Sequence, residues 1–144
     1  MSQLLLMCWI AGRRVAVPAL RVRSVIDVDT IIPIPRSPDH VVGLTALRSQ
    51  VLTVIDCRSS LGFGPAGEIS GMRAAVVEQE GHAYALLLED ASDVEEAETE
   101  PEILPGGFGE IWNRVAEGMV ETATGPALVV AIEKLIAGPM KAAA

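Results

Sequence analysis

The feature that most constrains the fold is the repeated interruption of short apolar segments by glycine and proline, of which the chain contains 13 and 9. Segments such as Leu4–Ile10, Val51–Ile55 and Ala83–Leu88 have the length of strands and are short for helices. Many short strands joined by Gly/Pro turns favour a barrel or a sandwich. We therefore expect an all-β fold with one short C-terminal helix, Ile132–Ala137, stopped by Gly138-Pro139.

Turn residues divide the remaining segments. Hairpin turns are predicted at Ala11–Arg14, Glu80–His82 and Ala123–Gly125, and they join the strands Leu4–Ile10 with Val15–Val17, Arg73–Gln79 with Ala83–Leu88, and Val115–Thr122 with Ala127–Ala131. Three prolines make Ile32–Pro38 a rigid connector, which we expect to end in a helical turn at Asp39–Val42. Ser59–Gly71 and Leu104–Gly109 are predicted loops.

Residues 20–29 alternate between apolar and charged side chains. The apolar set is Leu20, Val22, Ile26 and Val28, and the charged set is Arg21, Arg23, Asp27 and Asp29. A period of two predicts one buried and one solvated strand face. Ser24 and Val25 break this pattern, because an inward serine next to an exposed valine indicates a bulge or a docking surface.

Length and charge restrict the domain organisation and the partners. With 144 residues and a net charge of −8, the chain fits a single domain at 1–139, with a frayed tail at 140–144. Such an acidic chain is not expected to bind nucleic acid or an anionic membrane surface. The apolar run Leu4–Ala11 is too short to span a membrane, and it lacks the features of a signal peptide.

Two chemically distinctive groups of residues have simple structural interpretations. Cys8 and Cys57 form no CxxC motif, so we expect reduced thiols, no disulfide framework and a cytoplasmic location. Residues 89–102 are rich in carboxylates, which predicts a solvated face or the guarded edge of a sheet. They lack the alternating oxygen ligands and the central glycine of a calcium loop.

The alternatives that involve chemistry lack local signatures. Cys57 beside Asp56, with His40 or His82 as a base, is a conceivable nucleophile, but Cys57 ends an apolar strand and reads as a buried, inert thiol. The two histidines and two cysteines have no zinc-ligand spacing. The glycine-rich run 62–67 lacks the Lys-Ser/Thr of a phosphate loop. No enzyme activity, metal or cofactor is expected.

Three charged residues in a largely apolar strand-turn region are candidates for binding or for internal pairing. They are Arg48, Asp56 and Arg58. From the residues alone, Arg48 could pair with an internal carboxylate or project as an interface anchor.

The run from Val41 to Arg58 resembles the most recognisable stretch of the CheW family of chemotaxis coupling proteins. The matching residues are Gly43, Leu47, Arg48, Asp56 and Arg58. Further similarity lies in Val15–Val25, which resembles the second strand of the family, in Leu86–Asp90, and in the closing helix Ile132–Ile136.

This resemblance implies two interwoven, five-stranded SH3-like barrels and a non-catalytic adaptor. Members bridge the CheW-like regulatory domain of a CheA-type histidine kinase to the cytoplasmic tips of methyl-accepting chemoreceptors, and a free monomer is expected. By position, Val22, Ser24 and Val25 would lie on a surface that meets receptor or kinase, and Gly43, Leu47 and Arg48 near a receptor-facing groove. Asp56 and Arg58 would fix the fold through internal hydrogen bonds.

This chain also departs from the family pattern. Ala46 stands for Asn, Ser49 for Gly, Thr53 for Pro, Cys57 for Leu, and Ser24 for Glu. An alternative function therefore follows from the same resemblance: a CheW-like regulator that binds only one of the two partners and competes rather than bridges.

Overall fold

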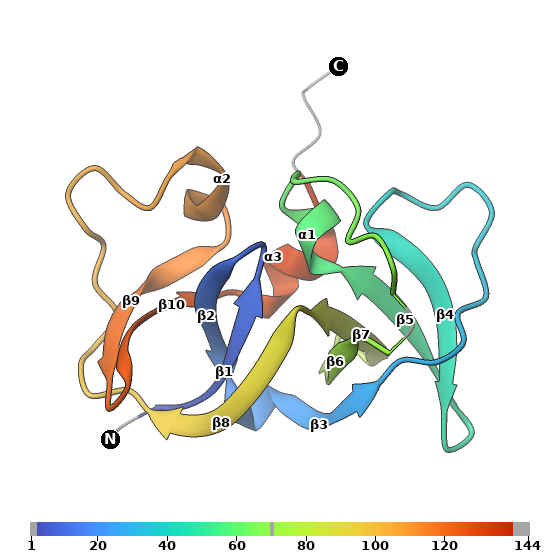
Figure 1. Ribbon diagram of the computed structural model, residues 1–144, viewed down its shortest axis with the longest axis horizontal. Coiled ribbons are helices and arrows are strands. Elements are labelled where there is room, and N and C mark those ends of the chain that lie inside the picture. Colours follow the sequence, from blue (N-terminus) through green and yellow to red (C-terminus); the bar gives the residue numbers. More distant parts are fainter. Residues whose placement is uncertain (1–2, 70, 140–144) are drawn as a thin grey trace.

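The computed structural model describes residues 3–69 and 71–139, so the expected frayed tail at 140–144 lies outside the described residues. Two five-stranded sheets lie side by side (Figure 1). The strands are β1 (Leu4–Ile10), β2 (Arg13–Pro18), β3 (Val22–Asp27), β4 (Val41–Leu47), β5 (Gln50–Asp56), β6 (Arg73–Gln79), β7 (His82–Leu88), β8 (Asp90–Glu96), β9 (Ala116–Thr122) and β10 (Gly125–Val130). The helices are η1 (Ala19–Arg21), α1 (Cys57–Ser60), α2 (Glu110–Asn113) and α3 (Ile132–Ala137).

The chain interweaves the two sheets. One sheet has the order β8-β1-β2-β10-β9 and takes its strands from both ends of the sequence. The other has the order β3-β6-β7-β5-β4 and takes its strands from the middle. The parallel pairs β10–β2 and β5–β7 close these crossings, while the other neighbouring pairs are antiparallel. The expected two-lobed, all-β architecture with a short C-terminal helix is confirmed.

Three groups of buried side chains form the core. One, containing Leu5 and Val129, fills the first lobe, and another, containing Leu52 and Val76, fills the second. The largest lies between the lobes and includes Cys8 of β1, Ile55 of β5, Cys57 of α1 and Leu135 of α3. The lobes therefore share one interior.

Several predicted elements differ in the structure. The turn predicted at Asp39–Val42 is shorter: it covers Asp39 and His40, closed by a 2.9 Å hydrogen bond from the Val41 amide to the Pro38 carbonyl, because Val41 already begins β4. The predicted loop at Ser59–Gly71 begins inside α1. Leu20 is 92% exposed rather than buried, because η1 interrupts the alternation before β3 begins at Val22.

The acidic stretch includes an edge strand. β8 pairs with β1 on one side only, and its carboxylates Asp90, Asp93 and Glu96 are exposed. Charged side chains on an edge strand discourage pairing with other chains, as expected for a guarded sheet edge.

Candidate partner-binding groove

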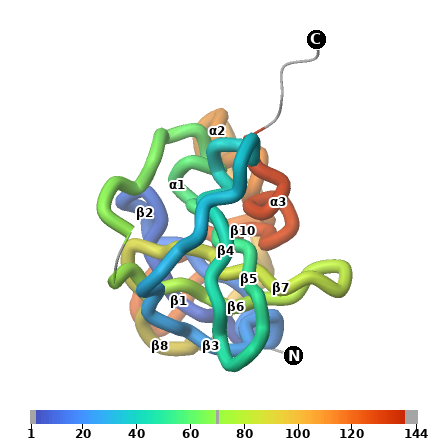
Figure 2. The backbone as a smooth tube through the Cα atoms, turned by 90° about the vertical axis from the view of Figure 1, so that its right-hand side faces the viewer, coloured from blue at the N-terminus to red at the C-terminus, as the bar shows by residue number. Residues whose placement is uncertain are grey.

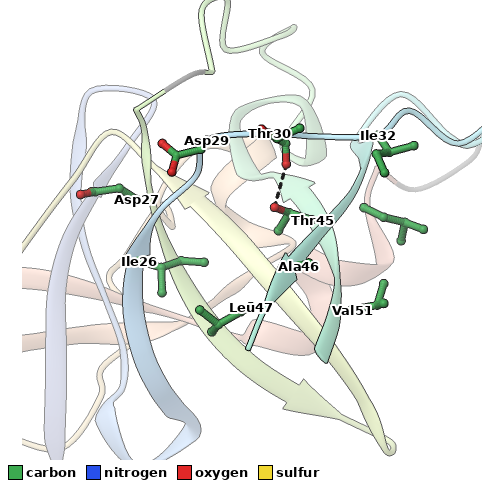
Figure 3. Close-up of a pocket in the computed structure, with 10 residues that line it drawn as sticks. Ile26, Asp27, Asp29, Thr30, Ile32, Thr45, Ala46, Leu47 and Val51 are labelled. Carbon is green, nitrogen blue, oxygen red and sulfur yellow. Dashed lines mark hydrogen bonds between the residues drawn. The ribbon is translucent and has the colours of Figure 1, made fainter. Parts of the chain in front are cut away.

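An open groove of about 450 Å³ lies between β3 and β4, which are the two ends of the second sheet. The curvature of this sheet brings its end strands to opposite sides of the groove, with Ile26 on β3 and Leu47 on β4 (Figure 3). The segment that connects β3 to β4 runs beside β4 and closes one end (Figure 2). The lining residues are Ile26, Asp27, Asp29, Thr30, Ile32, Leu44, Thr45, Ala46, Leu47 and Val51.

The floor of the groove is apolar. Ile26 and Leu47 pack on the core of the second lobe and leave part of their side chains facing the groove. Ile32 and Val51 are 65% and 61% exposed, which is unusual for large aliphatic side chains that lie near one another. Exposed apolar side chains gathered at a hollow mark an interaction surface.

Gly43 sets the closed end of the groove. Ile32 and Leu44 exchange two backbone hydrogen bonds of 2.8 Å, and this bridge holds the connecting segment against β4. A Cβ at position 43 would clash with the Ile32 carbonyl oxygen and would lie 2.8 Å from Cγ2 of Ile31. Gly43 is buried, and its lack of a side chain permits this close backbone approach.

Leu47 and Arg48 lie at the open end of the groove. Leu47 lines it, and Arg48 follows in the two-residue turn between β4 and β5. Arg48 and Ser49 have φ of 49° and 72°, the conformation of a type I′ turn. The Arg48 side chain is exposed and makes no ion pair within residues 3–69 and 71–139, so it projects from the turn instead of pairing internally.

Val22, Ser24 and Val25 lie on β3, at the other side of the groove. The pairing of β3 with β6 shifts register between Val22 and Ser24, which is the position where the sequence pattern broke. Ser24 is half-buried, and Val25 is 41% exposed. The structure thus brings the two predicted segments to one lobe, although neither Ser24 nor Val25 lines the groove itself.

Two carboxylates at the rim of the groove were not predicted as site residues. Asp27 and Asp29 line the groove, are exposed and form no ion pair with another described residue. Ile32 and Val51 were also not predicted as site residues. The available signals were that Ile32 is the first residue of the proline-rich connector and that Val51 lies near the start of a strand.

Asp56 and Arg58 stabilise the region behind the groove. The Asp56 carboxylate caps α1 by accepting hydrogen bonds from the amides of Arg58 and Ser59, at 3.0 and 3.2 Å, and also accepts one from Ala66 at 2.9 Å. The Arg58 guanidinium lies 5.9 Å from the ring centroid of Phe63. Arg58 therefore contributes a backbone hydrogen bond to Asp56 and a cation–π contact with Phe63.

The candidate nucleophile Cys57 lies in the shared core. It is fully buried with Cys8, and burial raises the pKa of Cys8 to about 12. Burial, together with the nearby Cys8 and Asp56, raises the pKa of Cys57 well above 9.0. Both thiols are therefore protonated at neutral pH, which disfavours nucleophilic chemistry.

The two histidines lie apart from any candidate site for chemistry. The ring of His40 is buried, with Nε2 2.9 Å from the Ile136 carbonyl oxygen, whereas His82 is exposed at the start of β7. Within residues 3–69 and 71–139, no three His, Cys, Asp or Glu side chains are placed to hold a metal ion. No helix in the same part of the chain is long and apolar enough to cross a membrane.

The first lobe exposes a second apolar surface. Leu4 on β1 and Val94 on β8 are diagonal neighbours on adjacent strands and are 43% and 52% exposed. Leu20 lies on η1, which contacts β1, and is 92% exposed. Apolar side chains are therefore exposed on both lobes, at the β3–β4 groove and around Leu4 and Val94.

Comparisons with known proteins agree with this architecture. The family model of the CheW-like domain matches residues 4–139. The crystal structure of the scaffolding protein TtCheW from Thermoanaerobacter tengcongensis is similar, with a TM-score of 0.78 and 23% identity over 94% of this chain and 88% of that chain. A search of curated proteins found no match.

Proposed function

The chain belongs to the family of CheW-like domains, and from this premise we propose that it is a non-catalytic scaffold that couples a CheA-type histidine kinase to chemoreceptors. The observation that supports this function best is the presence of two exposed apolar surfaces on different lobes, the β3–β4 groove and the surface around Leu4 and Val94. A bridging protein needs two surfaces that can be occupied at the same time.

The chemistry of the groove favours the kinase as its occupant. The regulatory domain of such a kinase is itself CheW-like, so it consists of strands and has strand edges of its own. The groove lies between the two edge strands of a sheet, β3 and β4, where a β-rich partner can pack. Leu47 and Arg48, which we expected near a receptor-facing groove, are thereby proposed to contact the kinase.

The surface around Leu4 and Val94 is then proposed to bind the receptor tip. It lies on the other sheet, and it includes no residue that lines the groove. Its apolar side chains stand beside exposed carboxylates such as Asp93 and Glu96. An apolar patch with a polar rim suits reversible association.

The test is a pair of matched substitutions, Val51→Asn in the groove and Val94→Asn on the first lobe. Both valines are more than half exposed, so neither change should unfold the protein. Titration calorimetry with a full-length CheA-type kinase should show weaker binding only for Val51→Asn. Titration with a receptor signalling fragment should show weaker binding only for Val94→Asn. Ala123→Asn, in an exposed turn, is the control.

The same titrations distinguish bridging from competition. Formation of a ternary complex with kinase and receptor supports the coupling function. Binding of one partner that excludes the other would support the single-partner regulator suggested by Ser24, Ala46 and Ser49. Saturable binding to neither partner would rule out both.

A further inference from the structure

The groove contains a strand edge that the protein itself leaves unpaired. Because the β4–β5 turn has two residues, Leu47 and Gln50 form the hydrogen-bonded pair that flanks it. Hydrogen-bonded and non-hydrogen-bonded pairs alternate along an antiparallel ladder. The next hydrogen-bonded pair is therefore Thr45 with Leu52 of β5. The backbone groups of Leu44 and Ala46 must then point away from β5, toward the groove.

The connecting segment uses only the first of these two positions. Leu44 exchanges both of its hydrogen bonds with Ile32. Continuing that pairing would place Thr30 opposite Ala46, but the Thr30 carbonyl instead accepts a 2.8 Å hydrogen bond from the Thr45 hydroxyl (Figure 3). No described segment outside the sheet forms a backbone hydrogen bond to Ala46, which is exposed.

The surroundings of Ala46 define what can pair with it. Leu47 and Val51 supply apolar contacts beside the free backbone groups, and Ile26 faces them from β3. Asp27 and Asp29 place two unpaired carboxylates on the same side as Ile26. A matching segment is extended, presents an apolar side chain to the floor and carries a basic side chain toward these carboxylates.

We propose that the groove binds an extended segment of the kinase regulatory domain through a β-bridge to the backbone of Ala46. This proposal rests on the function proposed above and adds its recognition chemistry. The Ile32–Leu44 bridge shows that a chain in this position has the correct geometry for β4. The carboxylate pair favours a segment whose apolar residue is accompanied by Lys or Arg.

The decisive variant is Ala46→Pro, which removes one backbone donor and adds little bulk. Proline is tolerated on an edge strand where its missing N–H would face solvent, so the β4–β5 ladder should persist. We expect unchanged cooperative unfolding and an affinity for the full-length kinase that is weaker by roughly three- to tenfold. Ala46→Ser, which keeps the amide, should bind as the parent does.

Amide hydrogen exchange gives a direct reading of the same contact. In the free protein the Ala46 amide should exchange rapidly, and saturation with kinase should slow it. The Thr45 amide, which faces β5, should be protected in both states. Protection of Ala46 that instead appears with increasing concentration of the protein alone would identify a second copy as the occupant and overturn the proposal.

The outcomes separate this inference from the function on which it rests. If Val51→Asn weakens kinase binding but Ala46→Pro does not, the groove binds the kinase without the bridge, and the inference is wrong. If neither change affects kinase binding, the function proposed for the groove fails. The double variant Asp27→Asn Asp29→Asn should lower the affinity for the kinase and reduce its dependence on salt. An unchanged salt dependence would show that the bound segment places no basic side chain near these carboxylates.

Discussion

The Asp56 carboxylate accepts a hydrogen bond of 2.9 Å from the amide of Ala66, ten residues further along the chain. The same carboxylate caps α1, so a single buried side chain fixes both the start of the helix and the loop that follows it. Asp56 therefore links the start of α1 to the loop at Ala66.

Replacing Asp56 tests this double role. Asp56→Ala leaves three amides without their acceptor and should lower the free energy of unfolding by about 2–4 kcal/mol. Asp56→Asn keeps one oxygen for the helix cap and loses the Ala66 contact, so we expect a smaller loss of about 1 kcal/mol. Urea denaturation measures both losses, and equal losses would show that the cap on α1 contributes nothing to stability.

Adjacent residues of β5 should respond oppositely to truncation. Leu52 is fully buried in the core of the second lobe, and Leu52→Ala should cost roughly 2–5 kcal/mol of stability. Val51 is 61% exposed, and Val51→Ala should change stability by no more than about 0.5 kcal/mol. Thermal and urea unfolding measure the stability of the two variants. Similar losses of stability would contradict the orientation assigned to β5.

Gly43 should tolerate no side chain, because the atom nearest to a Cβ at this position is the backbone carbonyl oxygen of Ile32, which cannot move aside as a flexible side chain would. Gly43→Ala should displace the Ile32 segment, destabilise the fold by roughly 1–3 kcal/mol and weaken kinase binding. Gly64 is the control, since its φ is +86° and its Cβ position is empty. Gly64→Ala should cost about 1 kcal/mol for backbone strain and leave kinase binding unchanged.

The β4–β5 turn stores strain that glycine would relieve. Ser49 has a φ of 72°, which is unfavourable for a residue with a Cβ. Ser49→Gly should therefore raise stability by about 0.5–1 kcal/mol. Gln50→Gly, one residue later and inside β5, should lower it by about 0.5–1 kcal/mol. Chemical denaturation that showed destabilisation by both glycines would contradict the turn assignment.

The buried thiols predict a loss of stability in alkali. The raised pKa of Cys8, about 12, means that the folded protein keeps a proton that the unfolded chain loses above pH 9. Unfolding therefore releases protons there, and the stability present below pH 9 falls as the pH rises toward 12. Cys57, whose pKa is also raised, acts in the same direction. Each thiol contributes a slope of up to about 1.4 kcal/mol per pH unit.

Urea midpoints at pH 8 and pH 10.5 measure this slope. The double variant Cys8→Ala Cys57→Ala should lose less stability between these two pH values than the parent, whatever its stability at pH 8. A parent protein with a flat profile over this range would show that the thiols are accessible in the folded state.

Local patterns were sufficient to predict much of the fold. Leu4–Ile10 and Arg73–Gln79 were recognisable as strands from their apolar length, and Ile132–Ala137 as a helix from its Gly-Pro stop. β8 lies at a guarded edge, but its bounds as a strand were not predicted. An edge strand pairs on one side only and needs few apolar residues, and most residues of β8 are carboxylates. α1 was not predicted. It begins at the Asp56 cap, and a helix of four residues is too short to show helical periodicity in the sequence.

The groove depends on contacts that no local pattern contains. β3 and β4 are the two ends of the strand order, and only the curvature of the sheet brings Ile26 opposite Leu47. The family resemblance located Leu47 and Arg48, but it could not show that the Ala46 backbone lies unpaired beside them. That property follows from turn length and ladder register together.

The interwoven order of strands also determines when each lobe can fold during synthesis. The middle of the chain supplies every strand of the second lobe, which can assemble as soon as β7 has left the ribosome. The first sheet cannot be completed until β10 has been synthesised, because Val15 of β2 pairs with Leu128 of β10. β1 and β2 are therefore the longest-exposed apolar segments of the nascent protein, where a chaperone would have the most effect.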